Sequence, residues 1–202
     1  MCCSEAGVSK RRKSAALQRL PGVSMNSANQ PGTGFRFLPE EPLPHYTYVP
    51  GKQPHPESDP AGHSYGRLRD KADPIDPANW RASRPYLRGL DLFNCGLYWE
   101  SHVEFERLWL AAKRKGPVAD VLKAIIHLAA AGVKSLEGRP EGVLSHARRA
   151  AELLGHVERG MDNGNGEMLG LSVRQLIHLA TQIIETGWPD SPPMLLPYEA
   201  SS

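Results

Sequence analysis

The placement of proline constrains this chain more than any other feature. Eleven of its 18 prolines precede Trp80 and four follow Trp188, so only three lie between these two tryptophans. Proline interrupts helices and the interior of sheets. The chain therefore divides into a loop-rich N-terminal part, a regular middle and a short tail. We expect a helical domain over residues 83–188, long enough to bury one core, followed by a C-terminal tail over residues 189–202.

The residues before this domain fall into two stretches of different character. Residues 1–34 are rich in Ser, Gly, Asn and basic side chains, which predicts a disordered tail. The alternative is that translation begins at Met25. Residues 35–82 carry a proline every few positions, which predicts an extended arm. The arm also holds aromatic side chains that could anchor it to the helical body, with a flexible linker as the alternative. These anchors are Phe35, Phe37, Tyr46, Tyr48 and Tyr65.

The three interior prolines stand where helices are expected to begin. A proline in the first turn of a helix loses no hydrogen bond, and Pro85, Pro117 and Pro140 each precede a helix-forming run. Ser172 is expected to cap a last helix that ends at Gly187. The pattern predicts an all-α fold, a compact multihelical bundle of antiparallel helical hairpins with an extended N-terminal arm. The expected helical runs are 85–93, 97–114, 118–138, 141–160 and 173–187, with a loop over 160–166.

The third run has the periodicity of a central helix. Its apolar side chains recur every three or four residues and spread far around the helix, leaving a narrow polar stripe. We therefore expect Ile125 of this helix to lie in the core together with Tyr98 and Trp109. The apolar face comprises Val118, Leu122, Ile125, Ala129, Val133 and Leu136, and the stripe Asp120, Lys123, His127 and Lys134.

The net charge indicates which kinds of partner to expect, and the cysteine content indicates the compartment. The net charge of +2 argues against a nucleic-acid partner, and the basic cluster Lys10–Lys13 in a disordered tail is thin evidence for one. The three cysteines cannot all pair, which favours a reducing, cytoplasmic compartment. No apolar run is long enough for a transmembrane helix, so we expect a soluble protein whose partner is a protein or a small molecule.

One polar constellation could carry chemistry. His102 and Glu106 are four residues apart and hence neighbours on one helix face, which they share with the large side chains Tyr98, Phe105 and Trp109. A His–Glu pair at this spacing is most often a structural hydrogen bond. It could also be half of a metal site or an acid–base pair. The best third ligand is His127, and His55 and His63 from the arm could also reach in.

The remaining polar residues receive simpler interpretations. Glu100 and Glu104 form a second pair on the opposite side of the helix, and we expect them to point to water or to the helix start. We interpret the histidines of the later helices, His146, His156 and His178, as surface or core polar residues. The sequence assigns no catalytic residue, no metal ligand set and no cofactor. The candidate ligand-binding residues are Glu100, His102, Glu106, Trp109 and His127.

About a third of the chain resembles the bacterial and archaeal domain-of-unknown-function family 309. That family's pattern, Phe-Asn-x-Gly-x-[Tyr/Phe]-[aromatic]-Glu-x-His followed by Glu, Trp and an apolar helix with an alanine triplet, is matched here. Val103 and His127 stand where the family often has Glu and Gln. The arm resembles N-terminal extensions of some members, which favours order. The resemblance implies a compact multihelical fold and no established activity. The matching residues are Phe93, Asn94, Gly96, Tyr98, Trp99, Glu100, His102, Glu106, Trp109 and Ala129 to Ala131.

Two hypotheses about function follow from these residues. The first is a non-enzymatic module that binds a protein or small molecule in a groove between antiparallel helical hairpins, which is an analogy at the level of the fold. The second is a metal- or ligand-dependent enzyme, hydrolytic if a metal is bound, built on Glu100, His102, Glu106 and His127. Metal content, and its loss in His102→Ala, would separate them.

Overall fold

All three interior prolines lie in the first turn of a helix in the computed structural model. The structure describes residues 36–67, 70–161 and 166–195. Within these ranges every helix expected from the sequence is present, which confirms the all-α fold. The helices are α1 (Arg84–Asn94), α2 (Tyr98–Ala111), α3 (Pro117–Leu136), α4 (Pro140–Gly160) and α5 (Val173–Thr186).

Several predictions concern residues outside the described ranges. They are the disordered tail over residues 1–34, the alternative start at Met25, the basic cluster Lys10–Lys13 and the anchor Phe35. Part of the loop expected over 160–166 and the end of the C-terminal tail also lie outside them.

The helix ends follow the expected local chemistry. The Ser172 hydroxyl accepts a hydrogen bond from the Gln175 backbone N–H (3.3 Å) and so caps α5. At the other end of α5, Gly187 has a φ of +85°, a value that residues with a side chain rarely adopt. Each helix therefore begins and ends close to where the sequence places its boundary.

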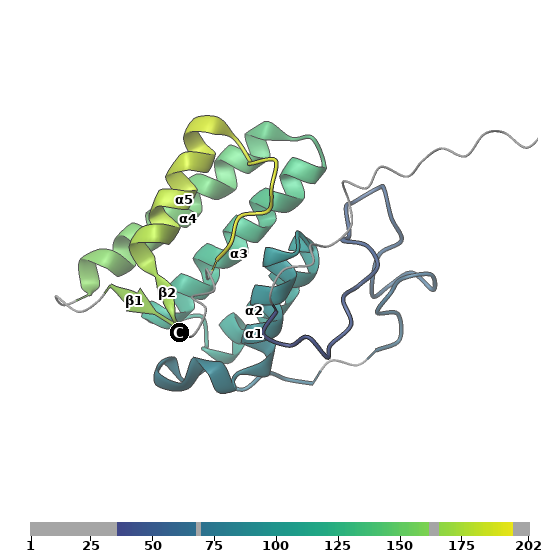
Figure 1. The fold of residues 1–202 in the computed structure, drawn as a ribbon, viewed down its shortest axis with the longest axis horizontal. Coiled ribbons are helices and arrows are strands. Elements are labelled where there is room, and N and C mark those ends of the chain that lie inside the picture. Colours follow the sequence, from purple (N-terminus) through teal and green to yellow (C-terminus); the bar gives the residue numbers. More distant parts are fainter. Residues whose placement is uncertain (1–35, 68–69, 162–165, 196–202) are drawn as a thin grey trace, which may run out of the picture. The chain divides into compact units, whose positions relative to one another are not determined.

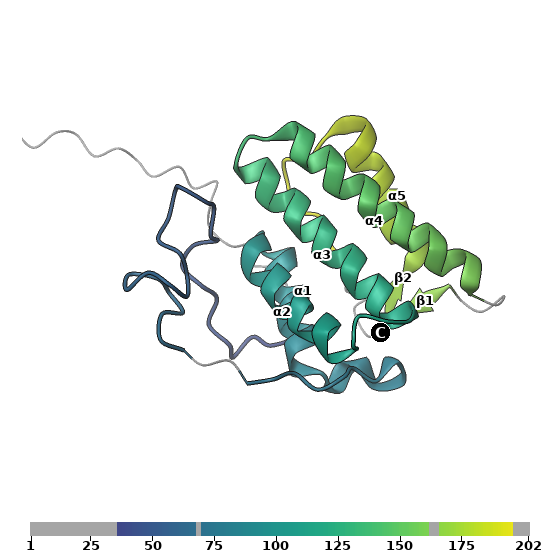
Figure 2. The same cartoon turned by 180° about the vertical axis from the view of Figure 1, so that it is seen from behind.

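Consecutive helices pack against one another, and α3 lies between α2 and α4 (Figures 1 and 2). α1 packs on α2, and α5 packs on α4. More than half of the residues of α3 are buried, including Leu122, Ile125 and Leu128. This arrangement confirms the central position expected for the third helix. Within the described residues, no helix combines the length and apolarity needed to cross a membrane.

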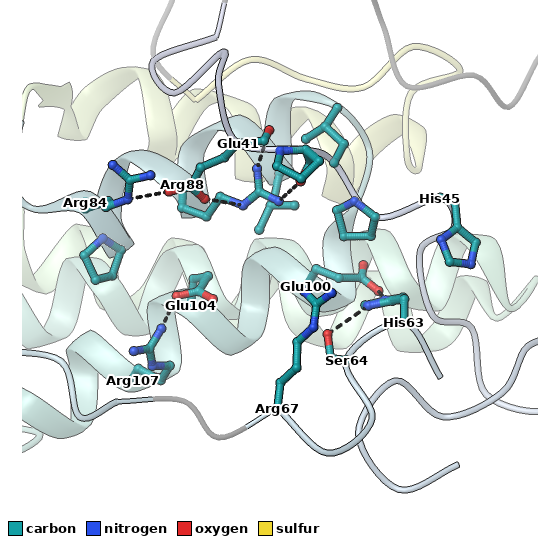
Figure 3. A pocket seen from close by; sticks show the side chains of 15 residues that line it. Glu41, His45, His63, Ser64, Arg67, Arg84, Arg88, Glu100, Glu104 and Arg107 are labelled. Carbon is teal, nitrogen blue, oxygen red and sulfur yellow. Dashed lines mark hydrogen bonds and ion pairs between the residues drawn. The ribbon is translucent and has the colours of Figure 1, made fainter. Parts of the chain in front are cut away.

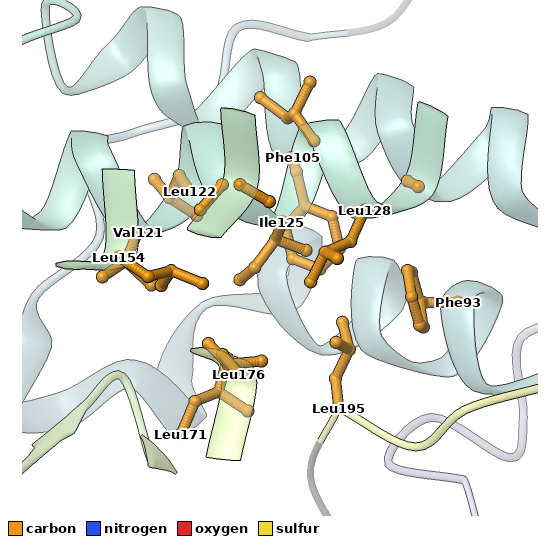
Figure 4. Packing of buried hydrophobic residues seen from close by; sticks show 14 of the residues in the cluster. Phe93, Phe105, Val121, Leu122, Ile125, Leu128, Leu154, Leu171, Leu176 and Leu195 are labelled. Atoms are coloured by element: carbon orange, nitrogen blue, oxygen red, sulfur yellow. The ribbon is translucent and has the colours of Figure 1, made fainter. Parts of the chain in front are cut away.

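The core is formed mainly by the facing sides of α1 to α5 (Figure 4). Tyr98 and Ile125 are 3% and 0% exposed, as expected. Trp109 is only partly buried, so its predicted place inside the core is wrong. It packs at the rim of the core, where the Lys123 ammonium lies 4.1 Å from the ring centroid. Burying the indole completely would also bury or displace this cation.

Three short elements are not predicted by the sequence. A 3₁₀-helix, η2 (Pro77–Ala82), precedes α1 and buries Trp80. Two two-residue strands, β1 (Glu167–Met168) and β2 (Leu171–Ser172), form an antiparallel hairpin just before α5. The hydroxyl of Tyr86 in α1 donates a hydrogen bond to the Leu169 carbonyl (2.8 Å) and holds this hairpin against the bundle.

The arm, residues 36–67, contains no helix or strand and lies beside α1 and α2 (Figures 1 and 2). Leu38 and Val49 are buried, at 8% and 4% exposure. The Tyr48 ring packs edge-on against Trp99 of α2, with ring centroids 5.4 Å apart. Phe37, which packs on Trp80, and Tyr48 thus act as anchors. The contacts of Tyr46 lie within the arm, and Tyr65 is 52% exposed.

Candidate functional site

Glu100, in the first turn of α2, is the main polar contact between the arm and that helix. Its carboxylate accepts hydrogen bonds from the Thr47 hydroxyl (2.9 Å), the Tyr48 backbone N–H (3.0 Å) and the His63 imidazole Nε2 (3.0 Å). The Glu100 and His63 side chains are 3% and 6% exposed. Burial of a carboxylate is tolerated only with such partners. The expectation that Glu100 points to water is therefore wrong, because the arm covers it.

Asp91 is the corresponding polar contact between the arm and α1. Its two carboxylate oxygens accept hydrogen bonds from the backbone N–H groups of Phe37 (2.8 Å) and Leu38 (2.9 Å). Burial raises the pKa of Asp91, and these two hydrogen bonds oppose that rise by stabilising the ionised form. The arm is thus bound to the helical body at two buried carboxylates, one on each helix of the α1–α2 hairpin.

A pocket of about 610 Å³ lies between the arm and the α1–α2 hairpin (Figure 3). One wall is formed by the arm, with Pro42, Pro44 and Ser64, and the other by side chains of α1 and α2. Most of the side chains that line the pocket are ionisable. The ionisable side chains that line it are Glu41, His45, His63, Arg67, Arg84, Arg88, Glu100, Glu104 and Arg107.

Three of the four guanidinium groups in this pocket are held in position by the arm and by α2. Arg84 and Arg88 of α1 both contact the Glu41 carboxylate, at 2.6 Å and 3.2 Å. Arg88 also donates to the Pro42 carbonyl (2.6 Å), and Arg107 pairs with Glu104 one turn earlier in α2. Burial lowers the pKa of Arg88, while Glu41 raises it. The group still stays charged, because arginine titrates far above neutral pH.

Four of the five predicted site residues lie away from this pocket, on the opposite side of α2. His102, Glu106 and Trp109 share that side, and Lys123 of α3 influences the His102 pKa and stacks on Trp109. The His102 Nε2 and Glu106 Oε2 atoms are 3.9 Å apart, too far for a hydrogen bond. Glu100 is separated from the other four because residues 100 and 102 project from nearly opposite sides of a helix.

His127, the predicted third ligand, pairs with a histidine rather than a carboxylate. Its Nδ1 lies 3.2 Å from Nδ1 of His146 on α4. Burial, followed by the charges of His146 and Lys123, lowers the pKa of His127 to about 4. The role of His146 as a partner of His127 was missed. In the described part of the chain, no three His, Cys, Asp or Glu side chains are grouped as a metal ion would require.

A second, smaller pocket of about 410 Å³ lies between the α3–α4 turn and the end of α5. Its lining is mostly apolar and includes Val143, Ile183 and Trp188, with Arg139 at its edge. The sequence-based hypothesis places a ligand in a groove between helical hairpins, and that hypothesis stays a prediction for this pocket. It lacks the convergent charged groups of the larger pocket, which is therefore the stronger candidate site.

Residues 86–145 match the protein family described as Domain of unknown function (DUF309). This segment is therefore similar to the DUF309 family. No curated protein and no solved structure matches the chain. The match confirms the resemblance carried by the motif that begins at Phe93.

The DUF309 match covers α1, α2, α3 and the beginning of α4. It therefore includes Asp91 and Glu100, which bind the arm, and Arg88 and Arg107, which line the helical wall of the larger pocket. The arm itself lies before the matched segment. The pocket is thus formed jointly by the segment that matches DUF309 and by residues outside it.

Proposed function

We propose that this protein is a binding module for a small molecule that carries an oxyanion, such as a carboxylate or phosphate group. The observation that carries the proposal is the convergence of four arginines, Arg67, Arg84, Arg88 and Arg107, on one pocket of about 610 Å³. Pockets of about 300 to 1,000 Å³ are typical of small-molecule sites. Arginine is the side chain best suited to oxyanions, because its planar fork of N–H donors matches their geometry.

The charges in the pocket support an anion over a cation. Four arginines line it against three glutamates, and each glutamate already accepts hydrogen bonds or ion pairs. Each guanidinium has five N–H donors, so Arg84, Arg88 and Arg107 keep donors beyond those used by their partners. The side chain of Arg67 makes no hydrogen bond or ion pair with the described residues, and it extends from the arm into the pocket (Figure 3).

The arm is essential to this proposal because it supplies one wall of the pocket. Its backbone carbonyl at Pro42 and its carboxylate at Glu41 hold Arg88 and Arg84 in place. Arginines fixed by such contacts lose little side-chain freedom when a ligand binds, which favours affinity. Binding of an oxyanion by these arginines does not itself depend on a reaction in the pocket.

Calorimetric titration of the full chain with inorganic phosphate and, separately, with succinate tests the proposal. We expect saturable binding of at least one of the two, and the comparison identifies the preferred oxyanion. Arg107→Gln and Arg67→Gln should each weaken binding about tenfold to a hundredfold, the size expected for loss of a charge-assisted hydrogen bond. Arg148→Gln, at an exposed position of α4 outside the pocket, is the matched control and should bind normally.

Two results would overturn the proposal. One is the absence of saturable binding of either anion at millimolar concentration. The other is equal weakening by Arg107→Gln and Arg148→Gln, which would show that the response is to net charge and not to the pocket.

A further inference from the structure

His63 connects the buried Glu100 carboxylate to a serine hydroxyl in the larger pocket. Its Nε2 lies 3.0 Å from Glu100 Oε1, and its Nδ1 lies 2.9 Å from Ser64 Oγ. All three residues line the pocket, and Figure 3 shows the His63 ring between the other two side chains. This chain of carboxylate, imidazole and hydroxyl is the arrangement that activates serine nucleophiles.

The carboxylate determines which nitrogen of the neutral imidazole carries the proton. Ionised Glu100 can only accept hydrogen bonds, so Nε2 of His63 must carry the hydrogen that it donates to Oε1. Nδ1 is then an acceptor, and the Ser64 hydroxyl donates to it. The Ser64 proton thus points at a base whose tautomer is fixed by a buried partner, which is what general-base catalysis requires.

Holding the arm does not explain the Ser64 hydroxyl. The arm is bound to α2 through Thr47, Tyr48 and His63, all of which contact Glu100 directly. The hydroxyl of Ser64, by contrast, bonds only to the residue before it in the chain among the contacts described, and so adds no link between arm and helix. Because this hydroxyl lies in a pocket lined by four arginines, it is placed to react with a bound anionic substrate.

We infer that Ser64, His63 and Glu100 hydrolyse an ester whose acid part carries a second, ionised carboxylate. The inference rests on the proposed function, because the arginines bind that carboxylate and present the ester carbonyl to Ser64. Ser64 is the nucleophile and His63 the general base. Glu100 is a positioning residue that acts through His63, and Arg67 faces the developing oxyanion.

The reaction balances in two halves, with water as the second reactant. Ser64 Oγ bonds to the carbonyl carbon while its proton passes to His63 Nδ1, and the carbonyl oxygen becomes an oxyanion. When the intermediate collapses, the bond to the alkoxy group breaks and that group takes the proton from His63, leaving as an alcohol. Water then attacks the acyl-serine, gives a proton to His63, and releases the dicarboxylic acid as Ser64 Oγ takes that proton back.

The probe is the mono-4-nitrophenyl ester of succinic acid, followed by release of 4-nitrophenolate from the full chain. We expect turnover in the wild type and a covalent succinyl adduct on Ser64 detected by mass spectrometry. Ser64→Ala should lower kcat at least about a hundredfold. The matched control is Ser58→Ala, which alters an exposed serine of the same arm outside the pocket and should keep the wild-type rate.

Glu100→Gln tests the positioning role separately. A glutamine amide can donate to Nε2 and so move the imidazole proton to Nδ1, where it faces Ser64 and blocks proton transfer. We expect kcat to fall while KM is nearly unchanged. A purely structural role would instead raise KM and leave kcat alone, because a loosened arm would weaken substrate binding.

Failure of this inference can be told apart from failure of the proposed function. If the wild type binds succinate but neither hydrolyses the ester nor forms an adduct, or if Ser64→Ala hydrolyses it at the wild-type rate, the catalytic inference is wrong and the binding module stands. If neither succinate nor phosphate binds, the proposed function fails first. Circular dichroism and melting temperature of Ser64→Ala confirm that the variant is folded.

Discussion

At the scale of single residues, the ionisable groups at the core and its rim fall into two sets with different surroundings. Asp91 and Glu100 are surrounded by donors from the arm. On the other side of α2, His127 and His146 lie among cations, and His102 lies near both Glu106 and Lys123. Burial lowers the pKa of each of these three histidines, and Lys123 lowers it further. Their protonation is therefore less favourable in the folded protein than in the unfolded chain.

Stability should fall as the pH drops below the ordinary histidine pKa of 6.5. The pKa of His127 is about 4 in the folded protein, so the unfolded chain binds the proton more readily. The stabilisation is full above pH 6.5 and is lost progressively toward pH 4. The charged groups that act on His127 are His146, Lys123, Arg149 and His102.

Urea unfolding of the wild type and of His127→Gln between pH 7 and pH 5 measures this effect. The variant should lose less stability over the interval, although His102 and His146 still contribute in the same direction. His178→Gln, at an exposed position of α5, is the control and should follow the wild type. An unchanged slope in His127→Gln would show that its imidazole does not couple protonation to folding.

At the scale of elements, the sequence predicts the helices well and the short elements not at all. The helices are long, have apolar residues at helical spacing, and begin at Pro85, Pro117 and Pro140, so local signals and tertiary packing agree. β1 and β2 have two residues each, too few for any alternation to show. Trp109 was misplaced because periodicity identifies the side of a helix but not whether a cation from α3 will share it.

The close approach of α2 and α3 depends on Gly132. A Cβ atom added at this position would lie 2.6 Å from the Tyr98 ring, and neither helix can move away without disturbing the core. Gly132→Ala should therefore destabilise the protein by about 1 to 3 kcal/mol, as overpacking does in other cores. Chemical denaturation measures the change.

Gly155→Ala on α4 is the matched control. The nearest atom to its added Cβ would be an arginine nitrogen at 3.4 Å, the end of a flexible side chain. This substitution should be neutral or stabilising by up to about 1 kcal/mol, because alanine favours the helix. Equal loss of stability in both variants would remove the steric argument for Gly132.

At the scale of the whole molecule, the candidate site is assembled from parts far apart in the sequence. Glu100 was selected from the sequence, but its partners precede it by 37 to 53 residues in a segment without regular structure. No local sequence pattern predicts that His63 contacts Glu100. The sequence does not predict that the pocket arginines converge, because Arg67, Arg88 and Arg107 are spread over three segments. Only the docked arm brings them to one pocket.

Two residues of the DUF309 motif contact segments outside the matched residues 86–145. Glu100 binds the arm, and the side chain of Asn94 accepts a hydrogen bond from the backbone N–H of Leu195 near the C-terminal end of the described chain (3.0 Å). These motif residues hold flanking segments on the bundle. The whole account therefore depends on an arm that is docked through Asp91 and Glu100.

Amide hydrogen exchange, resolved by residue, tests this docking most directly. The N–H groups of Phe37, Leu38 and Tyr48 donate to the two carboxylates and should exchange about tenfold to a hundredfold more slowly than that of Gly51, an exposed turn residue of the same arm. In Glu100→Ala, protection of Tyr48 should be lost. Exchange at Tyr48, Phe37 and Leu38 as fast as at Gly51 in the wild type would contradict a docked arm, and with it the pocket.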